Sequence, residues 1–379
     1  MASATAGGVR VLVAGGGTGG HLYPGIAVAH AVTAIAPGSV VTFVGTAAGI
    51  ESRVVPREGF TLDTIRSGGL KGKSMVALAR GVGLVPLGLI DAWRVISRRR
   101  PQVVVGVGGY SSGPVVLLAA LRRLPTLVLE QNAVPGLTNR WLARVVDEAA
   151  VTYDQTRRWF PRGALVTGNP VREGFLRAGV EGPAAAGDAL SRRLLVFGGS
   201  QGAAAINDAM IAAAPRLARA GAGLEVTHQT GERDLARVRT AYDAAGLVAR
   251  VEPFLHEMDR EMAWADLVVS RAGATTLAEL TAIGRPALLV PLPTATDDHQ
   301  RRNAEALAAT GAAEVIEQSR ITGDVLAGRV LALLADRPGL ARMAAAARAA
   351  ARPDAARVIA ARILALAGGK PPRAGGQSQ

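Results

Sequence analysis

The chain has no cysteine and few aromatic residues. Among its 379 residues, phenylalanine, tryptophan and tyrosine together account for 4%. The lack of cysteine excludes disulfide frameworks and thiolate metal sites, and it favours a reducing, cytoplasmic setting. The scarcity of aromatics leaves little to stack on bases, and no helix-turn-helix, zinc-finger or ribonucleoprotein motif is present. We therefore expect no nucleic-acid partner.

Long unbroken apolar runs are also absent. Residues 101–121 carry no charge, but a glycine-rich stretch, 108–114, interrupts them. A membrane-spanning helix needs about 20 apolar residues without such a break. The first residues, MASATAGG, lack the basic region and apolar stretch of a secretory signal. The sequence predicts neither a spanning helix nor a secretory signal, and residues 101–121 are expected to form strand, loop and helix.

Positive charge is abundant, and part of it is clustered. The formal net charge is +13, which requires an acidic partner or surface. The apolar run 81–90 has basic residues on both sides, namely Arg66, Lys71, Lys73, Arg80, Arg94, Arg98, Arg99 and Arg100. Apolar surface rimmed by cations is typical of a peripheral membrane contact. We expect residues 66–100 to bind an anionic membrane surface; the alternative is a core-packing helix with solvated arginines.

Two strand-like runs each end on a glycine-rich turn that restarts as a helix. Residues 11–14 lead into Gly15–His21, and residues 194–197 lead into Gly198–Ala203. Outward amides, a helix N-terminus and the absence of side chains together make an anion site. One such turn in each half predicts two nucleotide-binding-type domains and a phosphate-rich ligand or pair of ligands.

The rest of the chain alternates strand and helix signals, as a doubly wound parallel α/β fold does. The expected strands are 9–14, 40–45, 103–107, 126–130, 149–152, 194–197, 224–228, 249–253, 267–270, 287–290 and 313–316. The length favours two domains. We place them at residues 1–170 and 171–352, followed by a C-terminal helix at 353–367 and a disordered tail at 368–379. Residues 182–187 are expected to form a linker or exposed loop, and Pro353 should break the helical segment 325–367.

The first glycine turn also fits G-x-G-x-x-G, so a nicotinamide oxidoreductase has to be considered. That motif needs an acid at the end of the second strand to hold a ribose. Here the second strand ends on Gly45-Thr46 without a carboxylate, which argues against it. His21 follows the turn at the start of a helix, where we expect a neutral ring that can accept a proton. The alternative is a histidine that only positions the loop.

Several further residues suit a phosphate and sugar ligand. A second glycine turn, 108–114, should lie beside the first and could grip a second phosphate, or simply connect strand to helix. Glu279 could accept both hydroxyls of a ribose, or be favoured there by the helix dipole. Gln300 and Asn303 share a helix face and suit sugar hydroxyls. The acid pair 297–298 is a poor magnesium site and fits helix capping.

Seven motifs in order resemble the MurG family of N-acetylglucosaminyltransferases. They are GGGTGGH, GGYSSGP, LEQNAVPGLTNRWLA, VTGNPVR, GGSQGA, SRAGATTLAEL and DDHQRRNAEAL, within a similarity that runs from about Val9 to Ala365. The family adds N-acetylglucosamine to the lipid-linked muramyl-pentapeptide precursor of peptidoglycan. The resemblance implies a GT-B fold of two Rossmann-like domains facing a cleft. It also implies a peripheral place on the cytoplasmic face of the membrane and a link to the cell-wall and division machinery.

The resemblance also implies site residues. Ser200 would meet the donor phosphate, the Phe254 backbone the uracil, and Glu279 the ribose. The full donor set would be Thr18, Gly19, Gly20, Asn132, Arg172, Ser200, Gln201, Phe254, Ala274, Thr275, Thr276, Glu279, Gln300 and Asn303. The acceptor set would be Gly16, Gly17, Thr18, Gly109, Tyr110, Ser111 and Glu130.

The family's transfer inverts the sugar, so a base must take the acceptor proton as UDP leaves. We expect His21 to be this base, with Glu130 the next candidate. Amides around Ser200 would stabilise the leaving diphosphate, so we expect no metal at the reaction centre and no cofactor besides the substrate UDP-N-acetylglucosamine. The alternatives are a UDP-N-acetylglucosamine 2-epimerase and a non-catalytic membrane-binding module.

Overall fold

The computed structural model describes residues 8–68, 75–181, 192–199, 201–220 and 223–369, without the side chains of 75–85 and 296. The chain divides into two compact units. The first unit comprises Met1–Arg172 and Pro353–Gln379, and the second comprises Glu173–Arg352. The predicted linker, 182–187, and the tail from residue 370 lie outside the described residues.

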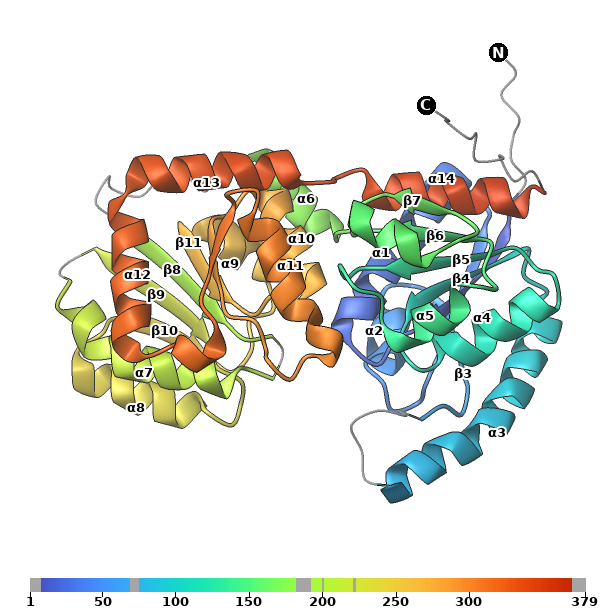
Figure 1. Ribbon diagram of the computed structural model, residues 1–379, viewed down its shortest axis with the longest axis horizontal. Helices are drawn as coiled ribbons and strands as arrows, with labels where there is room; N and C mark the ends of the chain where they lie inside the picture. Colours follow the sequence, from blue (N-terminus) through green and yellow to red (C-terminus); the bar gives the residue numbers. More distant parts are fainter. Residues whose placement is uncertain (1–7, 69–74, 182–191, 200, 221–222, 370–379) are drawn as a thin grey trace, which may run out of the picture. The chain divides into compact units, whose positions relative to one another are not determined.

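The first unit is built on a parallel sheet in the order β3-β2-β1-β4-β5-β6-β7. Strands β3, β4, β5, β6 and β7 of this sheet are labelled in Figure 1. Its strands are β1 (Arg10–Gly15), β2 (Val40–Gly45), β3 (Thr61–Thr64), β4 (Val103–Gly108), β5 (Thr126–Glu130), β6 (Glu148–Val151) and β7 (Ala164–Val166). Strand β1 pairs with both β2 and β4. The winding direction therefore reverses between β1 and β4, and ligands of such sheets bind beyond the carboxyl ends of the strands at this switch point.

Helices cover both faces of this sheet, because alternate residues of each strand point to opposite sides. Val11 and Val13 face one core, which α1 and α14 complete, and Leu12 and Ala14 face the other, which α3 and α4 complete. The helices are α1 (Gly19–Ile35), α2 (Glu51–Arg57), α3 (Met75–Arg99), α4 (Ser112–Leu121), α5 (Leu137–Leu142), η1 (Asp154–Trp159) and α14 (Ala355–Ala367). The C-terminal helix α14 thus belongs to the core of the first unit.

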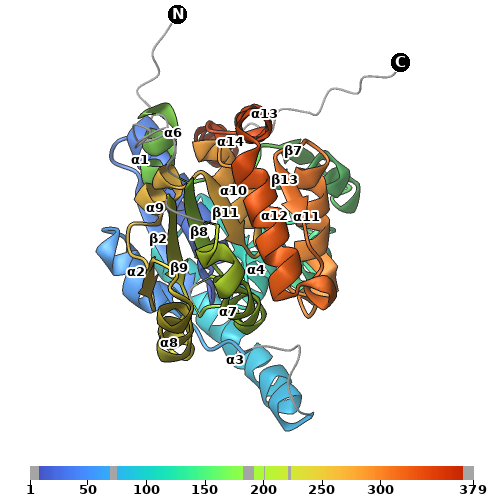
Figure 2. The same ribbon diagram turned by 90° about the vertical axis from the view of Figure 1, so that its left-hand side faces the viewer.

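The second unit repeats the plan with the strand order β10-β9-β8-β11-β12-β13. Its strands are β8 (Arg192–Phe197), β9 (Leu224–Gln229), β10 (Ala249–Glu252), β11 (Leu267–Ser270), β12 (Ala287–Leu289) and β13 (Ala313–Val315). The helices are α6 (Glu173–Glu181), α7 (Ala204–Ala218), α8 (Leu235–Ala245), α9 (Met258–Trp264), α10 (Ala274–Ile283), η2 (Thr296–Asp298), α11 (His299–Ala308), η3 (Gln318–Arg320), α12 (Gly323–Ala335) and α13 (Arg337–Ala350). Helices α7 and α12 pack side by side over the core (Figure 2).

The doubly wound fold predicted from the sequence is confirmed, with two differences. The edge strands β3 and β7 were not predicted, because they are short and largely exposed and so lack an apolar run. The segment 325–367 breaks near Pro353 as predicted, but it also breaks at Asp336. There the side chain of Asp336 caps α13 by accepting the N–H of Gly339, and Pro338 follows at the start of that helix.

Candidate functional site

The turns after β1 and β4 interlock at the switch point of the first unit. The N–H of Gly16 donates to the carbonyl of Gly108 over 3.2 Å. Gly109 has a φ of 84°, and a Cβ there would lie 2.5 Å from the carbonyl oxygen of Gly16. Only glycine permits this approach and this backbone conformation. The two predicted glycine turns are thus neighbours, and Gly16 and Gly109 form the contact between them.

His21 lies in the first turn of α1, against both of these turns. Helix α1 begins at Gly19 with Thr18 as its N-cap. The Oγ1 of Thr18 lies 3.2 Å from Nδ1 of His21. On its other side the ring packs against Gly108, where a Cβ would lie 2.6 Å from Cδ2 of His21. The half-buried imidazole is therefore held between its own helix cap and the second glycine turn.

Glu51, which the sequence analysis missed, lies inside the first glycine turn. Its carboxylate is at the start of α2 and accepts the N–H of Gly17 at 2.8 Å, the N–H of Thr46 at 2.8 Å and the hydroxyl of Thr46 at 2.9 Å. Burial raises the pKa of Glu51, but these hydrogen bonds outweigh burial and hold the pKa below its usual range. As the sequence indicated, β2 itself ends without an acid, and Glu51 follows it at the start of α2. This acid, only 1% exposed, binds backbone and is not offered to a ribose.

Glu130 holds the loop that follows β5. It accepts hydrogen bonds from Asn132, from the N–H of Gly136 and from the side chain of Asn139, at 2.9–3.2 Å. Burial raises its pKa, and these hydrogen bonds only partly oppose that shift. Because both carboxylate oxygens accept hydrogen bonds from the loop, the contacts of Glu130 fit a structural support of this loop better than an acceptor contact or a base. Of the other residues predicted to bind the acceptor, Tyr110 is exposed and Ser111 is buried.

Arg172 lies beside the N-terminus of α1. Its guanidinium carbon is 4.5 Å from the centre of the Tyr23 ring. A Cβ on Gly19 would lie 3.0 Å from the same ring. A cation stacked in this way is fixed near the first turn of the helix. The structure therefore groups Arg172 with Thr18, Gly19 and Gly20 in the first unit.

The second unit also has two closely packed turns, which follow β8 and β9. Gly199 and Gly202, with φ of 94° and 73°, form the turn after β8, and the N–H of Gly202 donates to the carbonyl of Gly199. Gly202 packs against the carbonyl of Thr230, so a Cβ would not fit there. Ser200 lies outside the described residues, and Gln201 beside it is exposed.

Gln229, at the end of β9, supports this turn and was also missed. Its Nε2 donates to the carbonyl of Gly199 at 2.9 Å, and its Oε1 accepts the N–H of Leu255 at 2.8 Å. The side chain is 2% exposed. It therefore ties the glycine turn to the segment that carries Phe254, whose exposed ring packs edge-on against His256.

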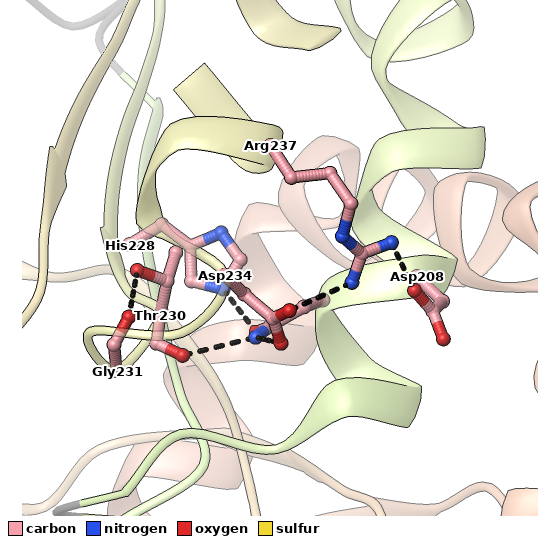
Figure 3. A network of polar contacts seen from close by, with 7 residues as sticks. Asp208, His228, Thr230, Gly231, Asp234 and Arg237 are labelled. Carbon is pink, nitrogen blue, oxygen red and sulfur yellow. Dashed lines mark hydrogen bonds and ion pairs between the residues drawn. The ribbon is translucent and has the colours of Figure 1, made fainter. Parts of the chain in front are cut away.

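A buried polar network lies behind the turn (Figure 3). His228 contacts the Tyr242 hydroxyl through Nδ1 at 2.7 Å and Oδ1 of Asn207 through Nε2 at 3.1 Å. Asn207 in turn donates to the carbonyl of Thr230 and to Asp234. Burial lowers the pKa of His228 to about 3, and the charge of Asp234 only partly opposes this. A neutral histidine thus helps hold α7 to the loop after β9.

Predicted sugar-binding residues gather on α10 and α11. Glu279 is buried and is the sixth residue of α10, beyond the first turn, so the helix dipole does not explain its position. Ala274, Thr275 and Thr276 form that first turn. In α11, Asn303 is buried, and Oε1 of Gln300 accepts the N–H of Leu292 at 3.0 Å.

The capping interpretation of the acid pair is wrong. Asp298 is the N-cap of α11, but its side chain makes no capping hydrogen bond. Asp297 and Asp298 instead adopt left-handed backbone, with φ of 54° and 56°. Among the described residues, no group of three or more histidine, aspartate or glutamate side chains lies close enough to hold a metal ion.

Helix α3 carries an exposed apolar stripe. Leu87, Ile90 and Trp93 recur every three residues and are exposed, Trp93 by 53%. Arg122 stacks on Trp93 at 4.6 Å. We call the three apolar residues Leu87, Ile90 and Trp93 the α3 patch. Within the described part of the chain, no helix is long and apolar enough to span a membrane.

The arginines near the α3 patch are not simply solvated. Arg66 pairs with Asp91, and Arg98 and Arg99 pair with Asp63. These ion pairs make the local positive charge smaller than the number of basic residues in 66–100 alone would indicate. Lys71 and Lys73 lie outside the described residues, as does the side chain of Arg80.

Comparisons with known proteins agree with this architecture. The models for the N-terminal and C-terminal domains of glycosyltransferase family 28 match residues 11–151 and 193–359. A relative from Anaeromyxobacter sp. (strain Fw109-5), named UDP-N-acetylglucosamine–N-acetylmuramyl-(pentapeptide) pyrophosphoryl-undecaprenol N-acetylglucosamine transferase, is 49% identical over 89% of this chain and 88% of its own. A protein of the same name from Pelobacter propionicus is 46% identical, over 88% of this chain and 93% of its own.

Two solved structures show the difference between a family relationship and a likeness of fold alone. MurG of Acinetobacter baumannii is 31% identical, with a TM-score of 0.74, and the match covers 94% of this chain and 99% of that one. A UDP-GlcNAc 2-epimerase from Neisseria meningitidis, solved with UDP-GlcNAc, has a TM-score of 0.70 over the same shares but only 13% identity. That likeness is one of fold alone. The chain belongs to glycosyltransferase family 28 and, within it, to the MurG N-acetylglucosaminyltransferases.

Proposed function

We propose that the chain transfers N-acetylglucosamine from UDP-N-acetylglucosamine to the C4 hydroxyl of an undecaprenyl-pyrophosphoryl-muramyl-pentapeptide. The observation that carries this proposal is that the strand beside each switch point, β1 and β8, ends in a glycine turn that packs closely against the turn after a neighbouring strand. Both substrates of this reaction contain a diphosphate. Two anion-binding turns of similar construction therefore fit a reaction with two diphosphate substrates.

We assign the donor to the second unit. The turn at Gly199–Gly202, together with Ser200 and Gln201, would hold the diphosphate, and the backbone beside Phe254 would meet the uracil. Glu279 would accept the ribose hydroxyls, since a carboxylate can accept two hydrogen bonds at once. The sugar would lie against the first turn of α10 and the amides of Gln300 and Asn303. The assignment is supported by the link that Gln229 makes between Gly199 and Leu255.

We assign the acceptor and the base to the first unit. In an inverting displacement the C4 hydroxyl attacks C1 of the donor sugar, its proton passes to the base and UDP leaves from the opposite face. His21 is our candidate base. Thr18 Oγ1 can accept a proton carried on Nδ1, which would leave the lone pair of Nε2 for the substrate. Arg172, with Thr18, Gly19, Gly20 and Asn132, would add positive charge and donors near the leaving diphosphate.

The test is release of UDP from UDP-N-acetylglucosamine, with and without a lipid-linked muramyl-pentapeptide analogue. Release that depends on the acceptor, with a disaccharide product, is the expected result. Conversion of the donor without acceptor would instead indicate an epimerase, and absence of any turnover would contradict both. We expect turnover to persist after chelation of divalent metal, because the turn amides would carry the leaving charge.

We also propose that the α3 patch docks the chain on the cytoplasmic face of an anionic membrane, where the lipid acceptor is found. Ile90→Asp would place a charge in the exposed stripe and should weaken flotation with vesicles of phosphatidylglycerol. Val180→Asp is the control, since Val180 is a highly exposed apolar residue of the second unit. Equal flotation of the two variants would contradict the assignment.

A further inference from the structure

Glu51 is a buried carboxylate that the proposed chemistry does not use, yet the first glycine turn is built around it. A Cβ on Gly16, Gly45 or Gly49 would collide with the Glu51 side chain. Three glycines from two loops therefore leave room for this one side chain. With donors from Gly17 and Thr46, they form a closed socket for an anion, and the protein supplies that anion itself.

The donors in the socket require a carboxylate. The N–H of Gly17 points at Oε2, and both donors of Thr46 point at Oε1. In a glutamine one of these oxygens becomes an amide NH₂, which donates and cannot accept. At least one of the three donors would then face another donor. Leaving such a buried N–H unsatisfied disfavours the native loop.

We propose that Glu51 is a positioning residue for the transfer reaction: as a resident anion it fixes Gly17, and through the neighbouring Thr18 cap it sets the orientation of the His21 ring. The connection is continuous, because Gly17 precedes Thr18 and Oγ1 of Thr18 lies 3.2 Å from His21 Nδ1. This inference rests on the proposed function, since it assumes that His21 acts in the transfer. Glu51 itself is 1% exposed, so its proposed role is to position other groups and not to contact the substrate.

Glu51→Gln in the full chain tests the proposal by kinetics. We expect kcat to fall by about 100-fold, as misplacement of a reacting group by about 1 Å does, while KM for UDP-N-acetylglucosamine stays unchanged. Asp147→Asn is the matched control. Asp147 accepts the N–H and hydroxyl of Thr126 at 2.9 and 3.0 Å, as Glu51 does with Thr46, but at the amino end of β5, away from the turns. The Asp147→Asn variant should have a kcat close to that of the parent chain.

Two measurements separate positioning from general damage. In Glu51→Ala, sodium formate should refill the socket and restore kcat with saturation, whereas sodium chloride should not. Backbone amide exchange at Gly17 and Thr46 should accelerate in Glu51→Gln and stay slow in Asp147→Asn. If Glu51→Gln does not fold, Thr46→Val removes one donor only and should lower kcat by about tenfold.

The outcomes are distinct. Unchanged kcat in Glu51→Gln, unchanged amide exchange, or an equal loss in Asp147→Asn would overturn the proposal. If the parent chain shows no acceptor-dependent UDP release, the proposed function fails. Amide exchange at Gly17 and Thr46 then decides separately whether Glu51 holds the turn.

Discussion

The two units contain the same strand, glycine turn and helix, but different chemistry holds each turn in place. In the first unit the support is the Glu51 carboxylate, which binds the N–H of Gly17. In the second it is the neutral amide of Gln229, which binds the carbonyl of Gly199. One support thus brings negative charge and occupies a donor of the turn. The other brings no net charge and occupies an acceptor.

This difference bears on how each turn meets a diphosphate. A fixed negative charge inside a turn opposes a second anion through the weakly screened interior. The turn of the second unit carries no such charge, and Gln229 binds one of its carbonyl groups instead of an N–H group, which suits tight donor binding. The turn of the first unit should bind the diphosphate of its substrate more weakly, and it is better suited to orienting a side chain. We therefore expect variants of the first unit to change kcat and variants of the second to change donor affinity.

The largest expected effect is that of His21→Ala. Loss of a general base should lower kcat by about 10²- to 10⁴-fold and leave the affinity for UDP-N-acetylglucosamine unchanged. Acceptor-dependent UDP release and calorimetric titration of the donor measure the two quantities. His30→Ala is the control, because His30 lies on the same helix but is exposed and pairs with Glu58. Near-normal turnover in His21→Ala would show that another group is the base.

Glu279→Gln should give the converse result. If the carboxylate accepts both ribose hydroxyls, its loss should raise the dissociation constant for the donor by about 10- to 100-fold, as for hydrogen bonds to a charged group, with kcat nearly unchanged. Glu305→Gln is the control, since Glu305 is an exposed partner of Arg301 on the adjacent helix α11. A fall in kcat without loss of affinity would contradict the division between the units.

The sequence predicted the parts of this comparison that depend on local pattern. Interior strands and both glycine turns follow from runs of buried residues that end on glycine, and His21 follows from its place after the first turn. Glu51 and Gln229 could not be found in this way. Each acts on a turn at least 30 residues away, and neither carries a local motif. Glu130 shows the reverse, since its motif was recognised but its role in its own loop depends on burial and on contacts with Asn139.

As the pH falls, the second unit should begin to lose stability at a higher pH than the first. The pKa of His228 is about 3 in the folded chain, below the 6.5 of an ordinary histidine, so the unfolded chain binds the proton first as pH falls. The contribution of neutral His228 to the free energy of unfolding is complete above about pH 6.5 and is lost as the pH falls towards 3. At pH 5 the loss amounts to about 2 kcal/mol. The pKa of Glu51 is lowered from 4.5, so its contribution is complete above about pH 4.5 and is lost only below it.

Amide exchange resolved by unit, between pH 7 and pH 5 and corrected for intrinsic rates, measures this difference. Protection of β8 and β9 should fall over that range while that of β1 and β2 persists. His228→Gln keeps a polar side chain and removes the titration, so it should flatten the dependence in the second unit. Equal loss in both units, or a slope that survives His228→Gln, would exclude His228 as the cause.

The smallest expected effect comes from replacing the neutral amide that supports the second turn, Gln229, by a carboxylate like the one that supports the first. Gln229→Glu loses the donor to Gly199 and adds a charge beneath the turn, and Gln229→Leu loses the same hydrogen bond without adding charge. The lost bond should weaken donor binding by about tenfold in either variant. If charge distinguishes the two turns, the glutamate variant should bind UDP-N-acetylglucosamine more weakly than the leucine variant. That difference in donor affinity should become smaller as ionic strength rises.

Equal losses of donor affinity in the two variants, measured by titration at low and high salt, would mean that the two supports differ in geometry alone. The division between an orienting turn and a binding turn would then have to rest on His21 and Glu279.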